Sequence, residues 1–213
     1  MQFSLFDFRC TKISLKEARS FFKENHYLKG CSNGGMYYGR YENGILVACV
    51  SFNVPVNPGL NACWLSDHHS AVFELTRLAL SPEASVSASQ FVSGSIKQWV
   101  KDRERLGLIK PRLLISYADS GEGHHGGVYQ SMSWLFCGIS PPTTSFIDST
   151  STKLHRRING RNRQATPFLR AVKGSVKFRY CKLLGSSKMK RHTKRLLKYK
   201  VLDYPKPNYL TSL

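Results

Sequence analysis

Apolar side chains in residues 15–27 recur at the spacing of one face of an α-helix. Ser14 precedes this run and Glu17 follows three residues later, which is the pattern of a capping box at a helix start. The pattern therefore predicts a helix that begins at residue 15 and buries one face. The apolar positions on that face are Leu15, Ala18, Phe21 and Phe22.

Shorter apolar runs beyond this helix have the lengths of strands, and they are separated by stretches at helical spacing. Asn43-Gly44 joins the first two of these runs and is a strong hairpin signal. A later helix begins at Ser87 or Ser89. The predicted strands are residues 36–41, 45–54, 72–80, 112–118, 134–139 and 176–184, and the further helices are residues 87–105, 123–133 and 189–201.

Strands that alternate with helices predict an α/β protein. With 213 residues, of which 41% are hydrophobic, the chain can bury one good core. We expect residues 1–140 to form that core. Residues 141–213 are expected to form a basic extension packed on it, within a single domain overall.

Positive charge is concentrated in the C-terminal quarter. The chain has 32 Lys and Arg against 13 Asp and Glu, and no acidic residue lies between Asp148 and Asp203. Such asymmetry indicates a polyanion partner, because neutralised phosphates release counterions and supply most of the non-specific affinity. A basic tail that serves solubility or membrane contact is the other interpretation. The expected DNA-binding residues are Arg156, Arg157, Arg161, Arg163, Lys188, Arg191 and Arg195.

No stretch of the sequence is apolar for long enough to span a bilayer, and the N-terminus lacks the pattern of a secretion signal. The cysteines are scattered without a Cys-x-x-Cys pair, which favours free thiols in a reducing compartment. We therefore expect a cytoplasmic protein with no membrane partner.

Residues 113–130 contain the densest group of ionisable side chains. An apolar strand there passes into a glycine-rich polar segment and then into a helical pattern, which is where α/β proteins place ligands. Strand alternation puts Tyr117 and Asp119 on one side. His125 and Tyr129 are four residues apart and would share a helical face. A glycine-rich turn with solvated side chains is the alternative interpretation.

The order of elements resembles that of the GNAT acyltransferases, whose mixed sheet splays open between its central strands to admit a pantetheine. Tyr129 precedes Ser133-Trp134 by four residues, as a helical tyrosine precedes a glycine–aromatic pair in many GNAT enzymes. The resemblance implies a GNAT-like mixed, splayed central sheet flanked by helices. It also implies that Tyr129 acts as a general acid.

A narrower resemblance is to the phage Mom family, which are GNAT relatives. It extends from about His26 to Lys206. It is carried by Phe-Glu-Leu-Thr-Arg-Leu at residues 73–78, the serine-rich residues 87–91, Tyr-Ala-Asp at residues 117–119 and His-Gly-Gly-Val-Tyr-Gln at residues 125–130.

Mom proteins convert adenine in phage DNA to an N6-carbamoylmethyl form, which protects the DNA from host restriction. The resemblance therefore implies a transferase that acts on double-stranded DNA inside the bacterial host. The enzyme would also need a small-molecule group donor. Whether it forms a homodimer stays open.

The N6 amine of adenine is a poor nucleophile because its lone pair is delocalised into the ring, so an enzyme must manage its proton and the donor's charge. We expect Asp119 to act as base or amine anchor and Tyr129 as proton donor, with His125 and Tyr117 beside them. In a regular strand Glu74 and Arg77 lie on opposite faces, so at most one would face the cleft. The residues expected to contact substrate or donor are Arg77, Ser116, His26, Tyr27 and Glu74.

GNAT enzymes usually bind the pyrophosphate of coenzyme A with a glycine-bearing loop after the fourth strand. Residues 80–90 have no glycine and include an acidic residue, so we do not expect ordinary acyl-coenzyme A binding. No metal site is predicted from the spacing of ligand types. An iron site of His26, Asp119 and His125 stays an open option, because sequence spacing cannot show whether these side chains meet.

Two other functions stay open. A GNAT-type acyltransferase that acts on RNA or protein would share the fold and the basic segment, but it should have the pyrophosphate loop. A non-catalytic basic nucleic-acid-binding protein would need only the basic segment. It would leave the cluster around Asp119, His125 and Tyr129 without a purpose.

Overall fold

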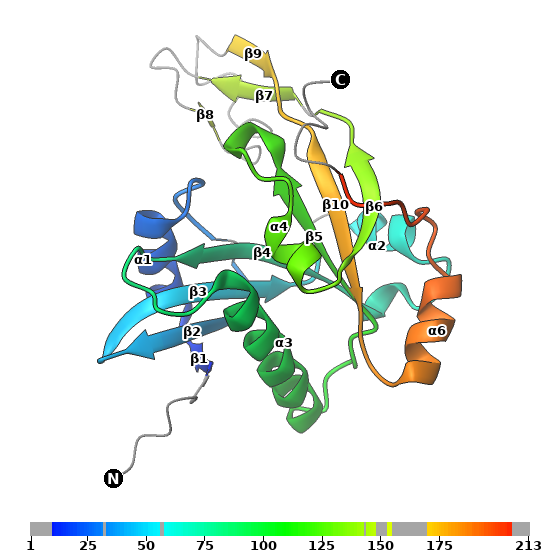
Figure 1. The fold of residues 1–213 in the computed structure, drawn as a ribbon, viewed down its shortest axis with the longest axis horizontal. Helices are drawn as coiled ribbons and strands as arrows, with labels where there is room; N and C mark the ends of the chain where they lie inside the picture. Colours follow the sequence, from blue (N-terminus) through cyan, green and yellow to red (C-terminus); the bar gives the residue numbers. More distant parts are fainter. Residues whose placement is uncertain are drawn as a thin grey trace.

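The computed structural model describes residues 10–31, 33–55, 58–142, 144–147, 153–154 and 170–205 (Figure 1). Helix α1 (Leu15–Asn25) begins with the expected capping box, since the Ser14 hydroxyl accepts from the Glu17 amide and Glu17 accepts from the Ser14 amide. Its apolar face buries Ala18, Phe21 and Phe22. The helix thus begins where the sequence predicts.

Strands β2 (Met36–Glu42) and β3 (Ile45–Asn53) form the expected hairpin. Asn43 and Gly44 both have positive φ, 51° and 78°, as the two central residues of a type I′ turn require. A short strand that the sequence analysis missed, β1 (Thr11–Ile13), pairs with the outer side of β2.

Seven strands form the main sheet in the order β1-β2-β3-β4-β5-β10-β6. Its neighbouring strands are antiparallel except for β4 and β5, which are parallel. A second sheet has the order β8-β7-β9. The strands not yet given are β4 (Val72–Leu80), β5 (Leu113–Asp119), β6 (Leu135–Ser140), β7 (Thr144–Ile147), β8 (Lys153–Leu154), β9 (Arg170–Lys173) and β10 (Lys177–Leu183).

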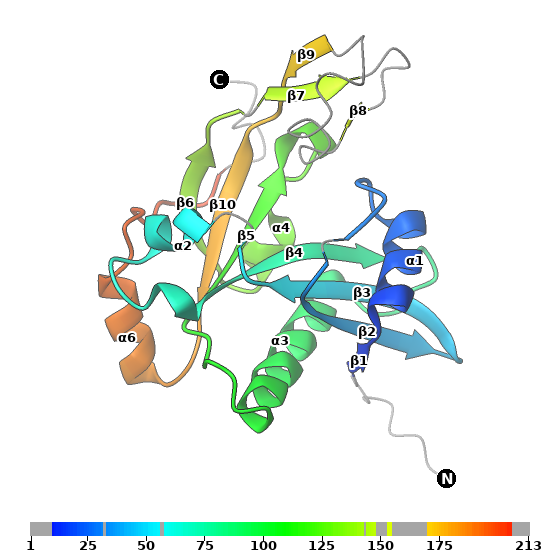
Figure 2. The same cartoon turned by 180° about the vertical axis from the view of Figure 1, so that it is seen from behind.

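Helices cover both faces of the main sheet (Figures 1 and 2). Helix α3 (Ala88–Arg105), capped by Ser87, packs on one face through Phe91, Val92, Ile96 and Trp99, together with α4 (Gly127–Ser131). Helix α1 and the helix α2 (Pro58–Trp64), which the sequence analysis missed, cover the other face. This confirms the α/β architecture expected from the sequence, with a mixed central sheet flanked by helices. No helix in the described part of the chain is long and apolar enough to cross a membrane.

Strand β10 lies between β5 and β6, although it begins 37 residues after the end of β6 and 58 residues after the end of β5 in the chain. The core expected from the sequence ends at residue 140. Residues 177–183 nevertheless supply an interior strand of the same sheet. The helix expected at residues 189–201 is α6 (Ser187–Arg195), which begins two residues earlier and ends six residues earlier than predicted.

The helix expected at residues 123–133 is wrong in length, because α4 has only five residues. Gly126 has φ +89°, and a Cβ there would lie 2.2 Å from the Tyr180 ring, so the chain is non-helical at this point. His125 therefore precedes the helix, and it does not share a helical face with Tyr129. Two 3₁₀ turns, η1 (His69–Ala71) and η2 (Ser120–Glu122), also flank β4 and β5.

A β-bulge in β4 changes which side chains face the same way. Ser51 pairs with Arg77 and Phe52 pairs with Leu75, so Thr76 is the extra residue. Its hydroxyl is 2.8 Å from the Ser51 hydroxyl and accepts from the Asn53 amide at 2.7 Å. Because the bulge shifts the alternation by one residue, Glu74 and Arg77 lie on the same side of β4, and the expectation that they face apart is wrong.

Candidate functional site

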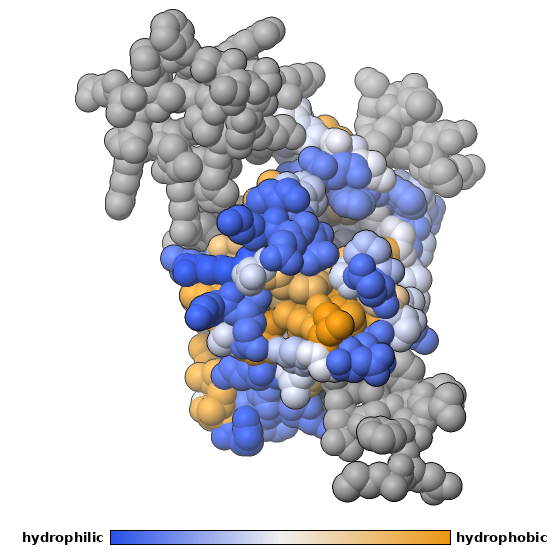
Figure 3. All heavy atoms as spheres, turned by 90° about the vertical axis from the view of Figure 1, so that its left-hand side faces the viewer, coloured by the Kyte–Doolittle hydropathy of each residue, from blue (hydrophilic) through white to orange (hydrophobic). Residues whose placement is uncertain are grey.

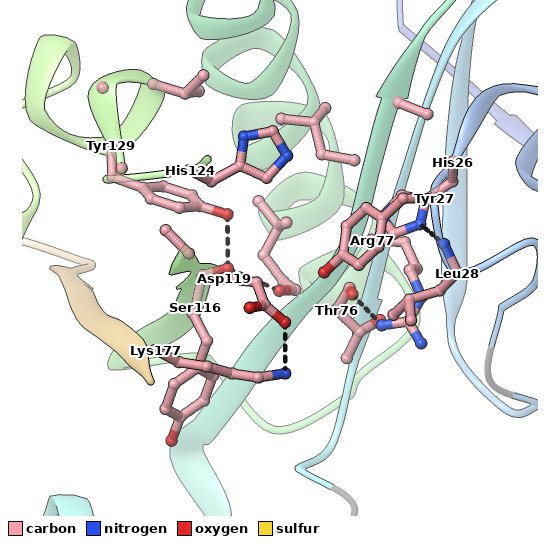
Figure 4. Close-up of a pocket in the computed structure, with 18 of the residues that line it drawn as sticks. His26, Tyr27, Leu28, Thr76, Arg77, Ser116, Asp119, His124, Tyr129 and Lys177 are labelled. Carbon is pink, nitrogen blue, oxygen red and sulfur yellow. Dashed lines mark hydrogen bonds and ion pairs between the residues drawn. The ribbon is translucent and has the colours of Figure 1, made fainter. Parts of the chain in front are cut away.

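The two parallel strands at the centre of the sheet separate after a short stretch of pairing. Strands β4 and β5 pair only through Val72–Glu74 and Leu113–Ile115. Beyond these residues lies a cleft of about 640 Å³, lined by the end of α1, the two strands, the loop before α4 and Lys177 of β10 (Figure 4). The side of the molecule that carries α1 is mainly hydrophilic and encloses an apolar area (Figure 3).

All the catalytic, substrate and donor residues expected from the sequence line this cleft, although their roles stay predictions. They are His26, Tyr27, Glu74, Arg77, Ser116, Tyr117, Asp119, His125 and Tyr129. Thr76, His124 and Lys177 also line the cleft, and they were not expected from the sequence. Nothing in the sequence spacing connects Lys177 with a site centred on residues 113–130.

Tyr129 and Ser116 form a short hydrogen-bonded chain that ends on the backbone of β4. The Ser116 hydroxyl donates to the Leu75 carbonyl at 2.9 Å, so its contact with Tyr129 at 2.8 Å must be donated by the Tyr129 hydroxyl. Burial raises the pKa of Tyr129 to about 12. Tyr129 is therefore a neutral group at physiological pH that holds its proton towards the cleft wall.

Glu74 is the carboxyl group best suited to exchange a proton near neutral pH. Burial raises its pKa from the ordinary 4.5 to about 7, although the positive charges of Arg77 and Lys177 oppose the shift. Arg77 donates through Nε to the Gly30 carbonyl at 3.1 Å and through Nη1 to the Thr76 carbonyl at 2.6 Å. Both partners are carbonyls, and no carboxylate of the described residues forms an ion pair with Arg77, so its charge can attract an anionic group in the cleft.

Asp119 differs from Glu74 because it is anchored in its charged form. Its carboxylate accepts from the Gly121 amide at 3.0 Å and from the Ser175 hydroxyl, and it lies 3.4 Å from the Lys177 ammonium group. Burial alone would raise its pKa, but these partners outweigh burial and lower it. Asp119 is thus ionised at neutral pH and fixes the loop after β5.

Tyr117 lines the cleft, but its hydroxyl accepts from the Trp64 indole at 3.2 Å. The ring also contacts Trp64 edge-on, with the centroids 6.4 Å apart. Tyr117 is therefore fixed against α2. Burial raises its pKa, so it stays protonated.

The end of α1 supplies His26 and Tyr27. His26 accepts from the Leu28 amide through Nδ1 at 3.1 Å, and burial and nearby Arg77 and His124 lower its pKa to about 4. It is neutral at physiological pH and carries its proton on Nε2. His125 is exposed, and its backbone carbonyl accepts from the Tyr180 hydroxyl at 2.6 Å, which anchors the loop before α4.

The iron ligands considered from the sequence are not assembled. In the part of the chain that the structure describes, no three His, Cys, Asp or Glu side chains are grouped so that they could hold a metal ion. His26 uses Nδ1 for the Leu28 amide, and Asp119 is already engaged by Ser175 and Lys177. The option of an iron site formed by His26, Asp119 and His125 is therefore wrong.

The loop between β4 and α3 does not fit the pyrophosphate of coenzyme A. The Ser85 amide and hydroxyl both donate to the Glu42 carboxylate, at 3.1 and 2.8 Å. The amides of Ser87 and Gln90 are used by the capping box of α3. A loop that binds pyrophosphate needs free amide donors and no negative charge beside them. Here several donors are occupied, and one of their partners is already an anion.

The expected DNA-binding residues fall into two groups. Arg156, Arg157, Arg161 and Arg163 lie outside the described residues. Lys188, Arg191 and Arg195 are exposed on α6. Helix α6 follows the end of β10 that is opposite to Lys177 and the cleft (Figures 1 and 2).

The sequence profile of the Mom protein family matches residues 7–206 of the chain. The chain belongs to the Mom protein family. The match includes every residue of the cleft and both basic groups, so the Mom resemblance found in the sequence is confirmed over almost the whole chain. None of the curated proteins is significantly similar to it.

Several solved acetyltransferase structures are similar in fold to this Mom family member. The ribosomal-protein-alanine N-acetyltransferase from Brucella melitensis is 14% identical, with a TM-score of 0.42 over 81% of this chain and 80% of that chain. The ribosomal-protein-S18-alanine N-acetyltransferase from Escherichia coli is 9% identical, with a TM-score of 0.48 over 84% and 95%. An N-acetyltransferase from Staphylococcus aureus Mu50 is 10% identical, with a TM-score of 0.46 over 83% and 98%.

The raised pKa of Glu74 predicts a pH-dependent effect of Glu74→Gln on stability. Because the folded-state pKa lies above the unfolded one, the wild type loses stability as pH rises from about 4.5 to 7. The glutamine variant lacks this loss. Its free energy of unfolding relative to the wild type should therefore increase by about 3 kcal/mol between pH 4 and pH 8.

Urea unfolding of both proteins at the two pH values measures this difference. Glu122→Gln is the matched control, because Glu122 is an exposed acid on the loop after β5. A Glu74→Gln effect of equal size at both pH values would contradict the raised pKa.

Because amides of the loop between β4 and α3 already have partners, we expect weak or absent binding of acetyl-coenzyme A in calorimetry. Glu42→Gln removes the negative charge at Ser85 and should raise the affinity. Glu83→Gln makes the same change of charge on the same loop without touching Ser85, so it should have a smaller effect. Tight binding by the wild type would show that the loop accepts the pyrophosphate despite Glu42.

Proposed function

We propose that this protein is a transferase that adds a carbamoylmethyl group to N6 of adenine in double-stranded DNA and so protects phage DNA from restriction. The observation that carries the proposal is the Mom family match over residues 7–206. The cleft supports it with groups suited to the chemistry. The donor would be a small acetamide-bearing molecule with a leaving group on its methylene carbon.

The reaction needs a base, an acid and positive charge, and different side chains of the cleft can supply each. A bond forms between N6 and the methylene carbon while the bond from that carbon to its leaving group breaks. Glu74, with a pKa of about 7, can take the N6 proton at neutral pH. Tyr129 can give a proton to the departing group, and Arg77 and Lys177 can stabilise negative charge that develops there.

Asp119 stays the alternative base. Its lowered pKa makes it a weaker proton acceptor at neutral pH than Glu74. Its contacts with Ser175, Gly121 and Lys177 instead suit a role in holding the loop after β5 and the start of β10.

DNA as substrate agrees with the charge of the chain. The formal net charge is +19, and the acid-free segment between Asp148 and Asp203 carries the excess. Phosphate contacts would supply affinity without reading sequence. They would also help to offset the few kcal/mol needed to take a base out of the stack.

The experiment that tests this function is mass analysis of nucleosides from DNA of bacterial cells that express the protein. We expect a deoxyadenosine variant heavier by one acetamide unit. The same DNA should resist restriction enzymes that cut at adenine-containing sites. Unmodified nucleosides despite good expression of folded protein would contradict the proposal and favour a binding protein.

Tyr129→Phe and Glu74→Gln should each lower the modification rate by about a hundredfold or more, because each removes one proton-transfer group with little change in shape. Asp119→Asn should act mainly through the loop and lower the melting temperature as well. Rates from single-turnover assays on duplex DNA measure the effect. Loss of activity in Asp119→Asn with full activity in Glu74→Gln would make Asp119 the base.

The basic segments predict a steep salt dependence of DNA binding. If about five side chains contact phosphates, the slope of log affinity against log salt should be about −4 to −5. Replacing Arg156, Arg157, Arg161 and Arg163 with glutamine should flatten the slope and weaken binding to all sequences alike. Fluorescence anisotropy over a salt series measures both effects.

The matched variant replaces Lys188, Arg191 and Arg195 of α6 with glutamine. It should flatten the slope less than the four-arginine variant does. A flatter slope in the α6 variant alone would place the contacts with the DNA backbone at α6, beyond the end of β10 that is opposite to Lys177.

A further inference from the structure

Two aromatic side chains meet across the mouth of the cleft from opposite walls. Tyr27 comes from the loop after α1, and His124 comes from the loop after β5 (Figure 4). Their ring centroids are 6.1 Å apart and the ring planes are inclined by 57°. Both side chains are exposed to solvent, Tyr27 over 39% of its surface, so the contact does not bury either ring in a core.

The two rings are supported differently. Tyr27 stacks on His26, with centroids 4.4 Å apart and planes inclined by 26°. His26 in turn contacts the buried Phe22 ring edge-on at 5.9 Å. The Tyr27 face is thus backed by the body of the protein. His124 instead follows Gly123, which has φ +71°, and its amide donates to the Asp119 carbonyl at 3.1 Å.

The spacing is close to that needed to hold a flat ring. Two rings that sandwich a third lie about 7 Å apart, because each stacking contact takes about 3.5 Å. Tyr27 and His124 would have to separate by about 1 Å and become parallel, which side-chain rotation of His124 can supply. Burial raises the pKa of Tyr27 to about 12, so the phenol that offers this face is uncharged at neutral pH.

We propose that Tyr27 and His124 form a stacking site that receives the extrahelical adenine between them. This inference rests on the proposed function and names its substrate contact. Unstacked bases in proteins are held between aromatic side chains, and histidine and tyrosine both serve this role. Glu74 and Tyr129 line the same cleft and are less exposed than the two rings, so a base held between the rings presents its edge to the groups that exchange protons.

The experiment compares binding of two duplexes that differ at one adenine. In one duplex the adenine is paired with thymine, and in the other it faces an abasic site, so it leaves the stack at little cost. The wild type should bind the second duplex at least tenfold more tightly. Permanganate reactivity of the thymine opposite a target adenine provides an independent readout, because that thymine loses its partner when the adenine leaves the stack.

Tyr27→Ala and His124→Ala should each reduce the preference by about tenfold, within the range for loss of one stacking partner. Binding to the fully paired duplex should change little, since phosphate contacts dominate it. Tyr27→Phe keeps the ring and should keep the preference. His69→Ala, at an exposed position in η1 away from the cleft, is the control.

The outcomes separate this inference from the function on which it rests. If the wild type modifies adenine and both alanine variants keep the full preference and the thymine reactivity, the stacking site is wrong and the function stands. If the wild type neither modifies adenine nor prefers the unpaired one, both are wrong. A melting temperature measured for each variant shows whether a lost preference reflects unfolding.

Discussion

The cleft exists because β4 and β5 stop sharing backbone hydrogen bonds after Glu74 and Ile115. Separated strands leave polar backbone groups that must find other partners, since an unpaired buried carbonyl or amide is costly. The Ser116 hydroxyl donates to the Leu75 carbonyl, and the Arg77 guanidinium donates to the Thr76 carbonyl. The side chains that stabilise the separated strands are therefore also the side chains that line the cleft. This explains why polar residues occur within otherwise apolar strands.

The same geometry gives two nearby carboxyl groups different charge states. Glu74 projects from the interior of β4, where burial outweighs the attraction of Arg77 and Lys177 and raises its pKa to about 7. Asp119 lies at the end of β5, where Ser175, Lys177 and the Gly121 amide hold it ionised. Environments that shift the pKa values of two nearby acids in opposite directions are typical of sites where one acid exchanges a proton and the other stays ionised. The different charge states depend on β10, because Lys177 begins this strand and Ser175 lies just before it.

Local rules allowed much of the fold to be predicted. The capping boxes at Ser14 and Ser87 and the Asn43-Gly44 turn are local interactions, and the structure confirms them. The errors arise where distant residues decide the backbone. The ring of Tyr180, more than fifty residues further along the chain, requires glycine at position 126 and delays the start of α4. The bulge at Thr76 depends on register with β3, and no periodicity within β4 could have indicated it. Lys177 could not be assigned to the cleft, because the placement of β10 between β5 and β6 is a property of the whole sheet.

The position of β10 also limits how DNA could contact the protein. The strand has seven residues, so its ends are about 20 Å apart, with the cleft near Lys177 and α6 beyond Leu183. If one duplex contacted both ends, its phosphate contacts would span at least about six base pairs, at about 3.4 Å per base pair. The segment with Arg156, Arg157, Arg161 and Arg163 leaves the second sheet at Leu154 and returns at Arg170. That sheet lies at the end of β10 that carries Lys177 (Figures 1 and 2). Strands β8 and β9, which flank this segment in the sequence, therefore lie towards the Lys177 end of β10, whereas α6 lies beyond its other end. If a duplex places its adenine in the cleft, as proposed, the basic side chains of α6 can contact only phosphates about six base pairs away. They would then add affinity without positioning the adenine itself.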